Sequence, residues 1–313
     1  MTLAFPVTEP VIVVVGPTAI GKTELSLSIA EIFSCEIISL DSMQVYRYMD
    51  IGTAKVSREE RERIPHYLLD MVYPDDEYNA NRFVKDTLEA LEKIYSKNKI
   101  PLLTGGTGLY LRALTEGLFE TGACHPDIRL QIHQKLQEKG SSKLHEELSL
   151  VDRNSAHKIH VNDTHRLLRA LEIFYATGKS WSEHLAAQAK HKGKGRFTNI
   201  LQLGLISDRE TLYRRINSRT SHMLEKGFKE EVEGLLDMGY DPALKSMQSI
   251  GYRHMLDHIL NNISLAETEA SLSRDTRRYA KRQYTWFKKM ELEWFHVASH
   301  DKILQRIEDF IGH

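Results

Sequence analysis

Short apolar runs alternate with amphipathic segments in two parts of the chain, residues 1–118 and 200–313. The runs have the length and the content of branched side chains that are typical of strands buried on both faces of a sheet. They lie at residues 11–15, 36–41, 100–107 and 199–206. Residues 22–33 and 80–98 instead place apolar side chains at helical spacing. The alternation predicts an α/β core domain with a parallel sheet flanked by helices.

The pattern changes at residues 119–199, where no β-rich run occurs. An apolar stripe over 128–136 ends at Gly140, and a second helix has Asp163 at its N-cap and Gly178 at its end. We therefore predict an all-helical insertion domain at 119–199 that interrupts the core domain.

Two capping boxes predict where long helices begin in the last part of the chain. Ser207 pairs with Glu210 at the start of a helix that runs to about residue 226. Ser264 pairs with Glu267 at the start of a second helix, which runs to about residue 290.

A glycine-bracketed loop joins the first strand to the first helix and fits the pattern G-x-x-x-x-G-K-[ST]. Two glycines let the backbone curl so that successive N–H groups face one anion, and the following helix adds its positive dipole end. The lysine adds a charge, and the threonine can offer a hydroxyl to Mg²⁺. The loop predicts a diphosphate or triphosphate site, against an ordinary strand-to-helix turn, but does not identify the compound. Its residues are Gly16, Pro17, Thr18, Ala19, Ile20, Gly21, Lys22 and Thr23.

Asp41 ends the second predicted strand. Because ligands bind at the carboxyl ends of parallel strands, we expect Asp41, the phosphate loop and residues 105–107 to meet at one edge. Beside bound phosphates, Asp41 can act as a general base. The alternatives are a carboxylate that holds Mg²⁺ through water, or a helix cap.

Arg219 falls on the apolar stripe of the predicted 207–226 helix, with Leu212 and Ile216. A guanidinium on the core side of a helix is costly unless it is paired. We expect it to meet an anion, either a ligand or a carboxylate of the chain itself. Arg215, one turn earlier, is predicted to lie on the flank of the helix.

Basic residues gather locally although the net charge is only −1. Residues 274–289 hold seven Lys and Arg side chains and one Asp, with four aromatic side chains between them. Arg166 and Arg169 form another pair. Each group taken alone is typical of a solvated surface, but several on a near-neutral chain favour a polyanionic partner.

Composition excludes several other classes. With 41% hydrophobic and 27% charged residues, the chain resembles ordinary globular proteins. Two cysteines, Cys35 and Cys124, are too few for a disulfide framework or a zinc site, which fits a cytoplasmic location. The sequence shows no signal peptide and no apolar run long enough for a membrane span. The fifteen histidines form no metal-binding pattern.

Several longer segments resemble the tRNA dimethylallyltransferases, also called tRNA isopentenyltransferases. They are GPTAIGKT at 16–23, ISLDSMQVYRYMDIGTAK at 38–55, TGGTGLYLRAL at 104–114, VNDTHRLLRALEIFYATGK at 161–179, SIGYR at 249–253 and AKRQYTWFKK at 280–289. The resemblance spans most of the chain in the family's order. It is closer to bacterial members, because eukaryotic relatives often append a C-terminal zinc finger that this sequence lacks.

The resemblance implies transfer of a dimethylallyl group from dimethylallyl diphosphate to N6 of the adenosine 3′-adjacent to the tRNA anticodon. The phosphate loop would then hold a prenyl diphosphate rather than ATP, with Thr18 and Lys22 on its phosphates and Thr23 at Mg²⁺. Asp41 matches the general base of the family, and Arg219 matches the arginine that stabilises the leaving diphosphate. These three side chains, Lys22, Asp41 and Arg219, are the catalytic candidates.

The resemblance also implies contacts with the anticodon stem-loop of tRNA. The matching positions are Asp41, Ser42, Met43, Gln44, Thr107, Arg129, His165, Arg166, Leu167, Leu168, Arg169, Gln248, Gly251, Tyr252, Arg253, Arg277, Lys281 and Arg282. We expect a monomer.

Three other functions compete with this one. A P-loop kinase or NTPase would turn over ATP, but it leaves the basic groups and the helical insertion without a purpose. An isopentenyltransferase that acts on free adenylate needs no grip on an anticodon. A non-catalytic RNA-binding protein would leave Asp41 and Arg219 without a role.

Overall fold

The computed structural model describes residues 6–117, 126–190 and 196–312, which form two compact units. The first unit comprises residues 1–115 and 196–313, and the second comprises 116–195. The predicted boundary at 118 and 119 lies outside the described residues, as does Cys124. Among the described residues, no helix is both long and apolar enough to cross a bilayer.

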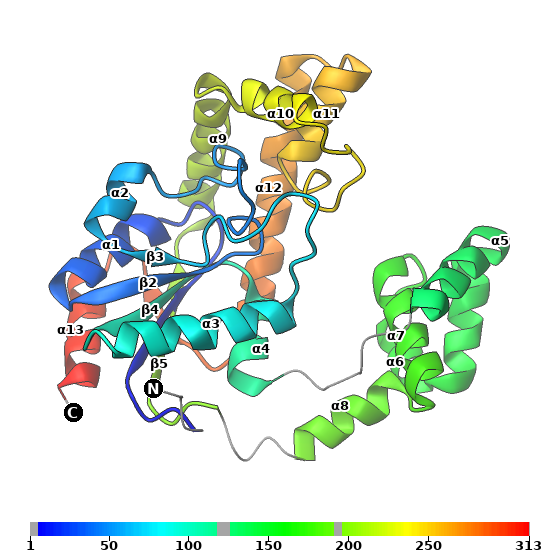
Figure 1. The fold of residues 1–313 in the computed structure, drawn as a ribbon, viewed down its shortest axis with the longest axis horizontal. Coiled ribbons are helices and arrows are strands. Elements are labelled where there is room, and N and C mark those ends of the chain that lie inside the picture. Colours follow the sequence, from blue (N-terminus) through cyan, green and yellow to red (C-terminus); the bar gives the residue numbers. More distant parts are fainter. Residues whose placement is uncertain (1–5, 118–125, 191–195, 313) are drawn as a thin grey trace. The chain divides into compact units, whose positions relative to one another are not determined.

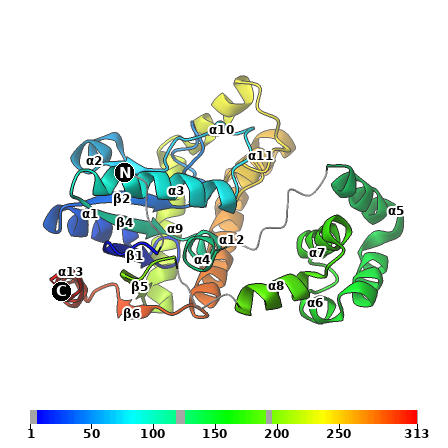
Figure 2. The same cartoon turned by 60° about the horizontal axis from the view of Figure 1, so that its bottom comes forward.

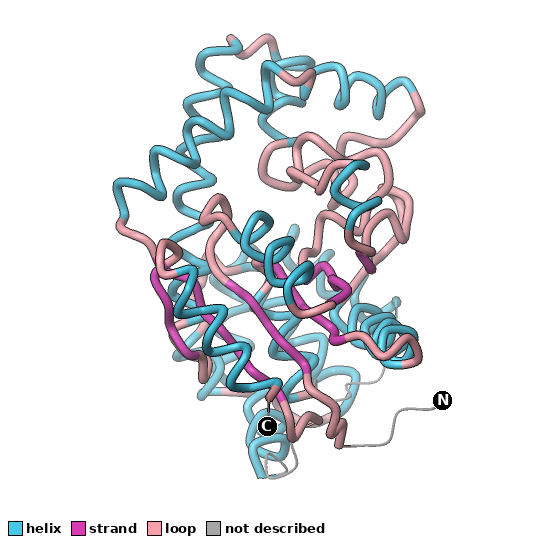
Figure 3. The backbone as a smooth tube through the Cα atoms, turned by 90° about the vertical axis from the view of Figure 1, so that its left-hand side faces the viewer, coloured by secondary structure: helices cyan, strands magenta, loops and turns pink. Residues whose placement is uncertain are grey.

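A parallel sheet forms the centre of the first unit (Figures 1 and 3). Its strands are hydrogen-bonded in the order β3-β2-β4-β1-β5-β6. The strands are β1 (Val11–Val15), β2 (Cys35–Leu40), β3 (His66–Tyr67), β4 (Ile100–Gly105), β5 (Ile200–Ile206) and β6 (Glu293–His296). All neighbouring pairs are parallel, so the carboxyl ends of β1, β2, β4 and β5 meet at one edge. The predicted parallel α/β sheet is confirmed.

Helices cover both faces of the sheet. Side chains along β1 alternate between these faces, so the strand contributes apolar side chains to two separate cores. On one face Ile12 and Val14 pack with α1 (Lys22–Ile32) and α13 (His300–Ile311). On the other face Val11, Val13 and Val15 belong to the core of α3 (Ala80–Tyr95) and α4 (Gly108–Glu116). Figure 2 shows the strands side by side among these helices.

Further helices stand at the carboxyl edge of the sheet (Figure 1). They are α9 (Arg209–Glu225), α10 (Phe228–Asp237), α11 (Tyr252–Asn261) and α12 (Leu265–Phe287), and the short α2 (Arg58–Arg63) lies between β2 and β3. Helices α9 and α12 pack against each other. This pair brings the chain between residues 207 and 290 to the same edge as the phosphate loop.

The second unit is all helical, as the sequence predicts. It contains α5 (Pro126–Val151), α6 (Arg153–Lys158), α7 (Thr164–Thr177) and α8 (Trp181–Lys190) around an apolar core of its own. Helix α5 is interrupted at Gly140, whose φ is 75°. The Asp163 carboxylate caps α7, which ends at Gly178.

Local signals predict some helix ends better than others. The capping box of Ser264 and Glu267 opens α12 as expected. The prediction for Ser207 is wrong, because the Asp208 carboxylate caps α9 by accepting from the N–H of Thr211. Strand β3 has only two residues, His66 and Tyr67, which is too short for a hydropathy pattern to reveal.

Candidate active site

The phosphate loop leaves β1 and enters α1 through a tight turn. Gly21 has φ 107° and Ala19 has φ 63°, so two residues adopt the left-handed backbone that the curl requires. Gly16 serves a different purpose from the one predicted. A Cβ there would lie 3.2 Å from the Leu205 backbone oxygen, so a side chain would crowd β5.

The Lys22 ammonium lies inside the turn. It donates to the backbone oxygens of Gly16 and Pro17 at 3.0 and 2.8 Å. Burial of the ammonium lowers the pKa of Lys22 to about 7, while Asp41 opposes this shift and Arg219 adds to it. A phosphate group bound in the loop would therefore meet a lysine whose charge is sensitive to pH near neutrality.

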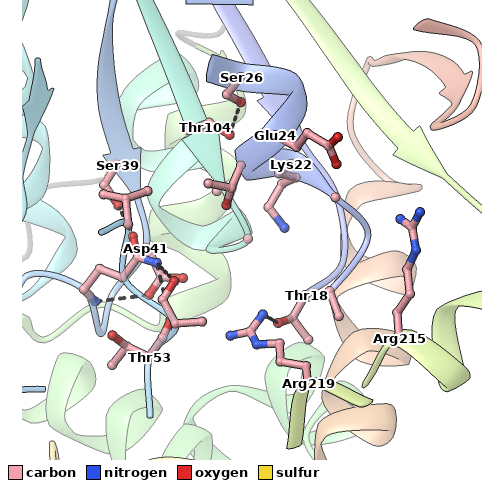
Figure 4. Close-up of a pocket in the computed structure, with 18 of the residues that line it drawn as sticks. Thr18, Lys22, Glu24, Ser26, Ser39, Asp41, Thr53, Thr104, Arg215 and Arg219 are labelled. Atoms are coloured by element: carbon pink, nitrogen blue, oxygen red, sulfur yellow. Dashed lines mark hydrogen bonds between the residues drawn. The ribbon is translucent and has the colours of Figure 1, made fainter. Parts of the chain in front are cut away.

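Arg219 reaches the loop from α9 (Figure 4). Its guanidinium donates to the Thr18 hydroxyl at 3.0 Å. Burial lowers the pKa of Arg219, and Asp41 opposes the shift. The alternative of an internal salt bridge is not borne out, since Arg219 forms no ion pair within the described part of the chain. Its charge is therefore available to an anion in the site.

Arg215 is an exposed residue of α9 beside the buried Ile216, as the prediction of a flank position has it. Its guanidinium donates to the backbone oxygen of Ile20 at 2.7 Å and lines the same cavity as Arg219. The two arginines are one helical turn apart on α9, so both can point to the phosphate loop.

Asp41 follows β2 on the opposite side of the cavity (Figure 4). Its Oδ1 accepts from the N–H groups of Met43 and Gln44 at 2.8 and 3.4 Å, so it caps the turn after the strand. Within the described residues Oδ2 accepts no hydrogen bond. The alternative of a helix cap is therefore wrong, because one oxygen caps a turn that no helix follows, and the other oxygen is left for a ligand.

Neighbouring polar groups hold this wall of the cavity. The Thr107 hydroxyl accepts from the N–H of Ser42 at 3.1 Å. The Gln44 amide accepts from the Ser39 hydroxyl at 3.0 Å and donates to the backbone oxygen of Thr53 at 3.4 Å. The expected convergence of the three strand ends is therefore observed.

A cavity of about 1030 Å³ lies between the phosphate loop and Asp41. Thr18, Lys22, Thr23, Asp41, Arg215 and Arg219 line it. A second cavity of about 330 Å³ shares Thr18, Asp41 and Arg219 with it and extends toward Ser249 and Arg282. A diphosphate and an acceptor could therefore approach the same carboxylate from two connected spaces.

The oxygen atoms that line the cavity suit Mg²⁺ better than zinc. Thr23, Asp41, Ser39 and Thr104 offer oxygen atoms to the cavity, and Mg²⁺ prefers oxygen ligands with several retained waters. No cluster of three His, Cys, Asp or Glu side chains that could hold a metal occurs in the described chain. A magnesium ion would therefore rely on Thr23, the substrate phosphates and water.

Gln283 is a further residue of this site that the sequence reasoning missed. It lies on α12, is 7% exposed, and accepts from the Thr18 N–H at 2.9 Å. A signal existed, because Gln283 shares the buried stripe of α12 with Ala280 and Phe287. A polar side chain on an apolar stripe is the same anomaly that singled out Arg219.

The predicted tRNA contacts in the first unit differ in their accessibility. Gln248, Lys281 and Arg282 are exposed, and Arg253 pairs with Asp275 at 2.6 Å. Arg277 donates to the Asn217 side chain on α9. Gly251 is buried.

Tyr252 is fully buried, and its hydroxyl donates to Glu231 at 2.6 Å. The Tyr252 side chain is thus engaged inside the protein, and a contact of this position with RNA stays a prediction.

In the second unit, three predicted arginines already have acidic partners. Arg129 and Arg169 flank the buried Glu172 at 3.4 and 3.1 Å, and Arg166 lies 3.4 Å from Asp163. His165 is exposed.

The side chains of Leu167 and Leu168 belong to the apolar core of the helical unit, and a contact of these two positions with RNA stays a prediction. Their place on α7 fixes the exposed His165 and Arg166 beside them.

Known proteins resemble the chain over almost its full length. Residues 44–290 match the family model described as IPP transferase. A tRNA dimethylallyltransferase of Desulfotalea psychrophila is 50% identical over 97% of this chain and 96% of its own length. A relative of the same name from Acetivibrio thermocellus is 44% identical over 97% and 98%.

Solved structures agree with these matches. A full-length tRNA isopentenylpyrophosphate transferase of Bacillus halodurans has a TM-score of 0.70 and 36% identity, covering 97% of this chain and 96% of that one. A eukaryotic dimethylallyltransferase described as acting on tRNA has a TM-score of 0.79 and 31% identity, covering 97% and 80%.

Proposed function

The chain belongs to the IPP transferase family, and from this premise we propose that it is a tRNA dimethylallyltransferase. It transfers a dimethylallyl group from dimethylallyl diphosphate to N6 of the adenosine 3′-adjacent to the anticodon and releases diphosphate. The observation that carries the proposal is one cavity with the phosphate loop and Arg219 on one side and Asp41 on the other.

The cationic side of the cavity suits the leaving group. In the transfer, the bond between N6 and the allylic C1 forms while the bond between C1 and the diphosphate oxygen breaks, and the diphosphate leaves with the electron pair. Lys22, Arg215 and Arg219 place positive charge where this negative charge develops. Preorganised charges of this kind usually contribute more to the rate of an enzyme than any other single effect.

Asp41 suits the acceptor side. Two backbone N–H groups orient its Oδ1, which leaves Oδ2 able to accept the proton that N6 loses. Because an adenine amine is a weak nucleophile, a fixed base helps mainly by removing that proton as the new bond forms.

Magnesium would neutralise part of the diphosphate charge when it is bound. Thr23 is the residue that we propose for it, since its hydroxyl lines the cavity at the start of α1.

The RNA is expected to bind chiefly through its phosphates and its shape. Arg253, Lys281 and Arg282 of the first unit and Arg129, His165 and Arg166 of the second are the side chains that we propose for this contact. The target adenosine must leave its stack to reach Asp41, as happens in other base-modifying enzymes. We propose that a monomer binds one anticodon stem-loop.

A competition between acceptors tests the function. The protein is incubated with labelled dimethylallyl diphosphate, Mg²⁺ and an equimolar mixture of unmodified tRNA and AMP. We expect label in tRNA alone, and the Asp41→Ala variant should transfer none. Label in AMP but not in tRNA would favour a free-nucleotide enzyme, and hydrolysis of ATP in a parallel reaction without transfer would favour an NTPase.

A further inference from the structure

Gln283 joins three parts of the first unit that are far apart in sequence. From α12, its Oε1 accepts from the Thr18 N–H in the phosphate loop at 2.9 Å. Its Nε2 donates to the backbone oxygen of Gly106, after β4, at 2.9 Å. The amide thus bridges two loops that line the cavity, one after β1 and the other after the neighbouring strand β4.

The geometry leaves the amide only one orientation. Thr18 offers a donor and Gly106 offers an acceptor, so a flipped amide would lose both hydrogen bonds. The fit is also close, because a Cβ at Gly106 would lie 2.2 Å from Nε2. One turn later on α12, Trp286 packs on Gly108 in the same way.

The bridge acts on Thr18, which is held from two directions. Gln283 accepts from its N–H, and Arg219 donates to its hydroxyl. Movement of Thr18 would therefore carry the Arg219 guanidinium with it. The next residue, Ala19, has φ 63°, a backbone conformation that persists only where the surroundings impose it.

Packing alone would not require an amide here. The neighbouring buried positions of this stripe, Ala280 and Phe287, are apolar, and burying an amide costs free energy unless its hydrogen bonds are satisfied. Two partners of Gln283 are loop backbone groups at the cavity. A third is the side chain of Tyr279, one turn earlier on α12, which also lines the cavity.

We propose that Gln283 is a positioning residue for the diphosphate site: it fixes Thr18, and through Thr18 the Arg219 guanidinium, from helix α12. The inference rests on the proposed function, which supplies the two substrates. The exposed side of the same helix carries Lys281 and Arg282, the side chains proposed for RNA. One helix then serves the two substrates from its two sides.

Binding of each substrate separates this role from a general structural one. Inorganic diphosphate with Mg²⁺ is titrated calorimetrically into the full chain without RNA, and an anticodon stem-loop is titrated separately. Gln283→Met keeps the length of the side chain and removes both hydrogen bonds. We expect it to weaken diphosphate binding about 10-fold and to leave the Kd for RNA within about twofold. The matched variant Lys281→Met should show the opposite pattern.

Three outcomes would overturn the inference. Unchanged diphosphate binding by Gln283→Met would show that the bridge does not position the loop. Equal losses for diphosphate and RNA, with a lower melting temperature, would show a structural role only. A fall in RNA affinity alone would place Gln283 with the RNA contacts. Failure of the wild-type protein to bind diphosphate would instead overturn the proposed function.

Amide hydrogen exchange in the wild-type protein tests the bridge without a variant. The Thr18 N–H should exchange more slowly than the Ala19 N–H in the ligand-free protein, because a buried side chain holds it. Equal and rapid exchange of both amides would contradict the bridge even if Gln283→Met fails to fold.

Discussion

Over the residues that the structure describes, Arg219 makes one hydrogen bond to the protein, whereas the Lys22 ammonium makes two. The Arg219 guanidinium donates to the Thr18 hydroxyl at 3.0 Å and forms no ion pair among the described residues, so its charge can serve the leaving diphosphate. We expect Arg219→Ala to lower the rate of prenyl transfer by about 10²–10³-fold, as removal of one preorganised donor does. Single-turnover transfer at saturating substrates measures this rate.

The affinity of Arg219→Ala for tRNA is the control. It should change by no more than about twofold, since Arg219 faces the phosphate loop. A parallel fall in RNA affinity and rate would mean that the arginine grips RNA instead of diphosphate.

Lys22 predicts an unusual dependence of diphosphate binding on pH. Burial lowers its pKa to about 7 in the ligand-free protein, whereas an anion on the ammonium favours the charged form. Binding above pH 7 must therefore take up a proton. We expect the Kd for diphosphate to rise by up to roughly 10-fold per pH unit above 7.

Lys22→Met supplies the reference for this titration, because it retains the ionisation of the diphosphate itself but lacks the ammonium. The pH dependence of the wild-type Kd should exceed that of the variant, and two parallel curves would contradict the shifted pKa. Stability should change in the opposite sense. The unfolded chain binds the Lys22 proton up to its ordinary pKa of 10.5, so the contribution of Lys22 to folding stability rises between pH 7 and 10.5.

Which site residues can be found from the sequence depends on where their partners lie. Asp41 and Lys22 belong to contiguous motifs, and Arg219 stands out as a charge on an apolar stripe. The contacts of Arg215, Arg219 and Gln283 with the phosphate loop escape sequence reasoning, because their partners are 195, 201 and 265 residues away. A periodicity reports that a side chain faces inward but does not report what it meets there.

The turn at residues 50–52 is an element whose position depends on one carboxylate of α10. The Glu231 oxygens accept from the N–H groups of Asp50, Ile51 and Gly52 at 2.8, 2.6 and 3.1 Å, and from the Tyr252 hydroxyl. The next residue, Thr53, lines both cavities. Glu231 thus fixes the turn that places Thr53 at the cavity.

Replacing this acceptor by an amide should be costly. In Glu231→Gln, an NH₂ group would face backbone donors, so buried hydrogen bonds are lost and donors are left unsatisfied. We expect the free energy of unfolding to fall by about 2 kcal/mol, measured by urea denaturation. Glu230→Gln is a matched control on the same first turn of α10, where the side chain is exposed. Equal effects of both variants would attribute the loss to the helix dipole rather than to the turn.

Helix starts show how a local signal can fail by one residue. Ser207 and Asp208 are both good N-cap residues, and the pairing of Ser207 with Glu210 favours the serine. In the structure Asp208 adopts the capping conformation, because β5 continues through Ile206 and delays the start of α9 to Arg209. Strand pairing, which is not local, decides the boundary.

At the scale of the whole molecule, a near-neutral chain is proposed to bind a polyanion through local charge. The net charge is −1, so the long-range attraction of the whole chain to RNA is weak, and local groups of basic side chains, those of α12 among them, are proposed to supply the attraction. Each phosphate that a cation neutralises releases counterions, which makes the affinity depend on salt. The slope of this salt dependence therefore measures how many RNA phosphates the protein neutralises.

Removing two of the exposed cations of α12 should therefore change the slope as well as the affinity. We expect the variant with Lys281→Ala and Arg282→Ala to bind tRNA more weakly at low salt, with the slope of log K against log salt concentration reduced by about 2. Lys85→Ala is the control, because Lys85 is also exposed but lies on α3, which packs on the face of the sheet. An unchanged slope in the double variant, or an equal change in Lys85→Ala, would show that RNA does not lie along α12.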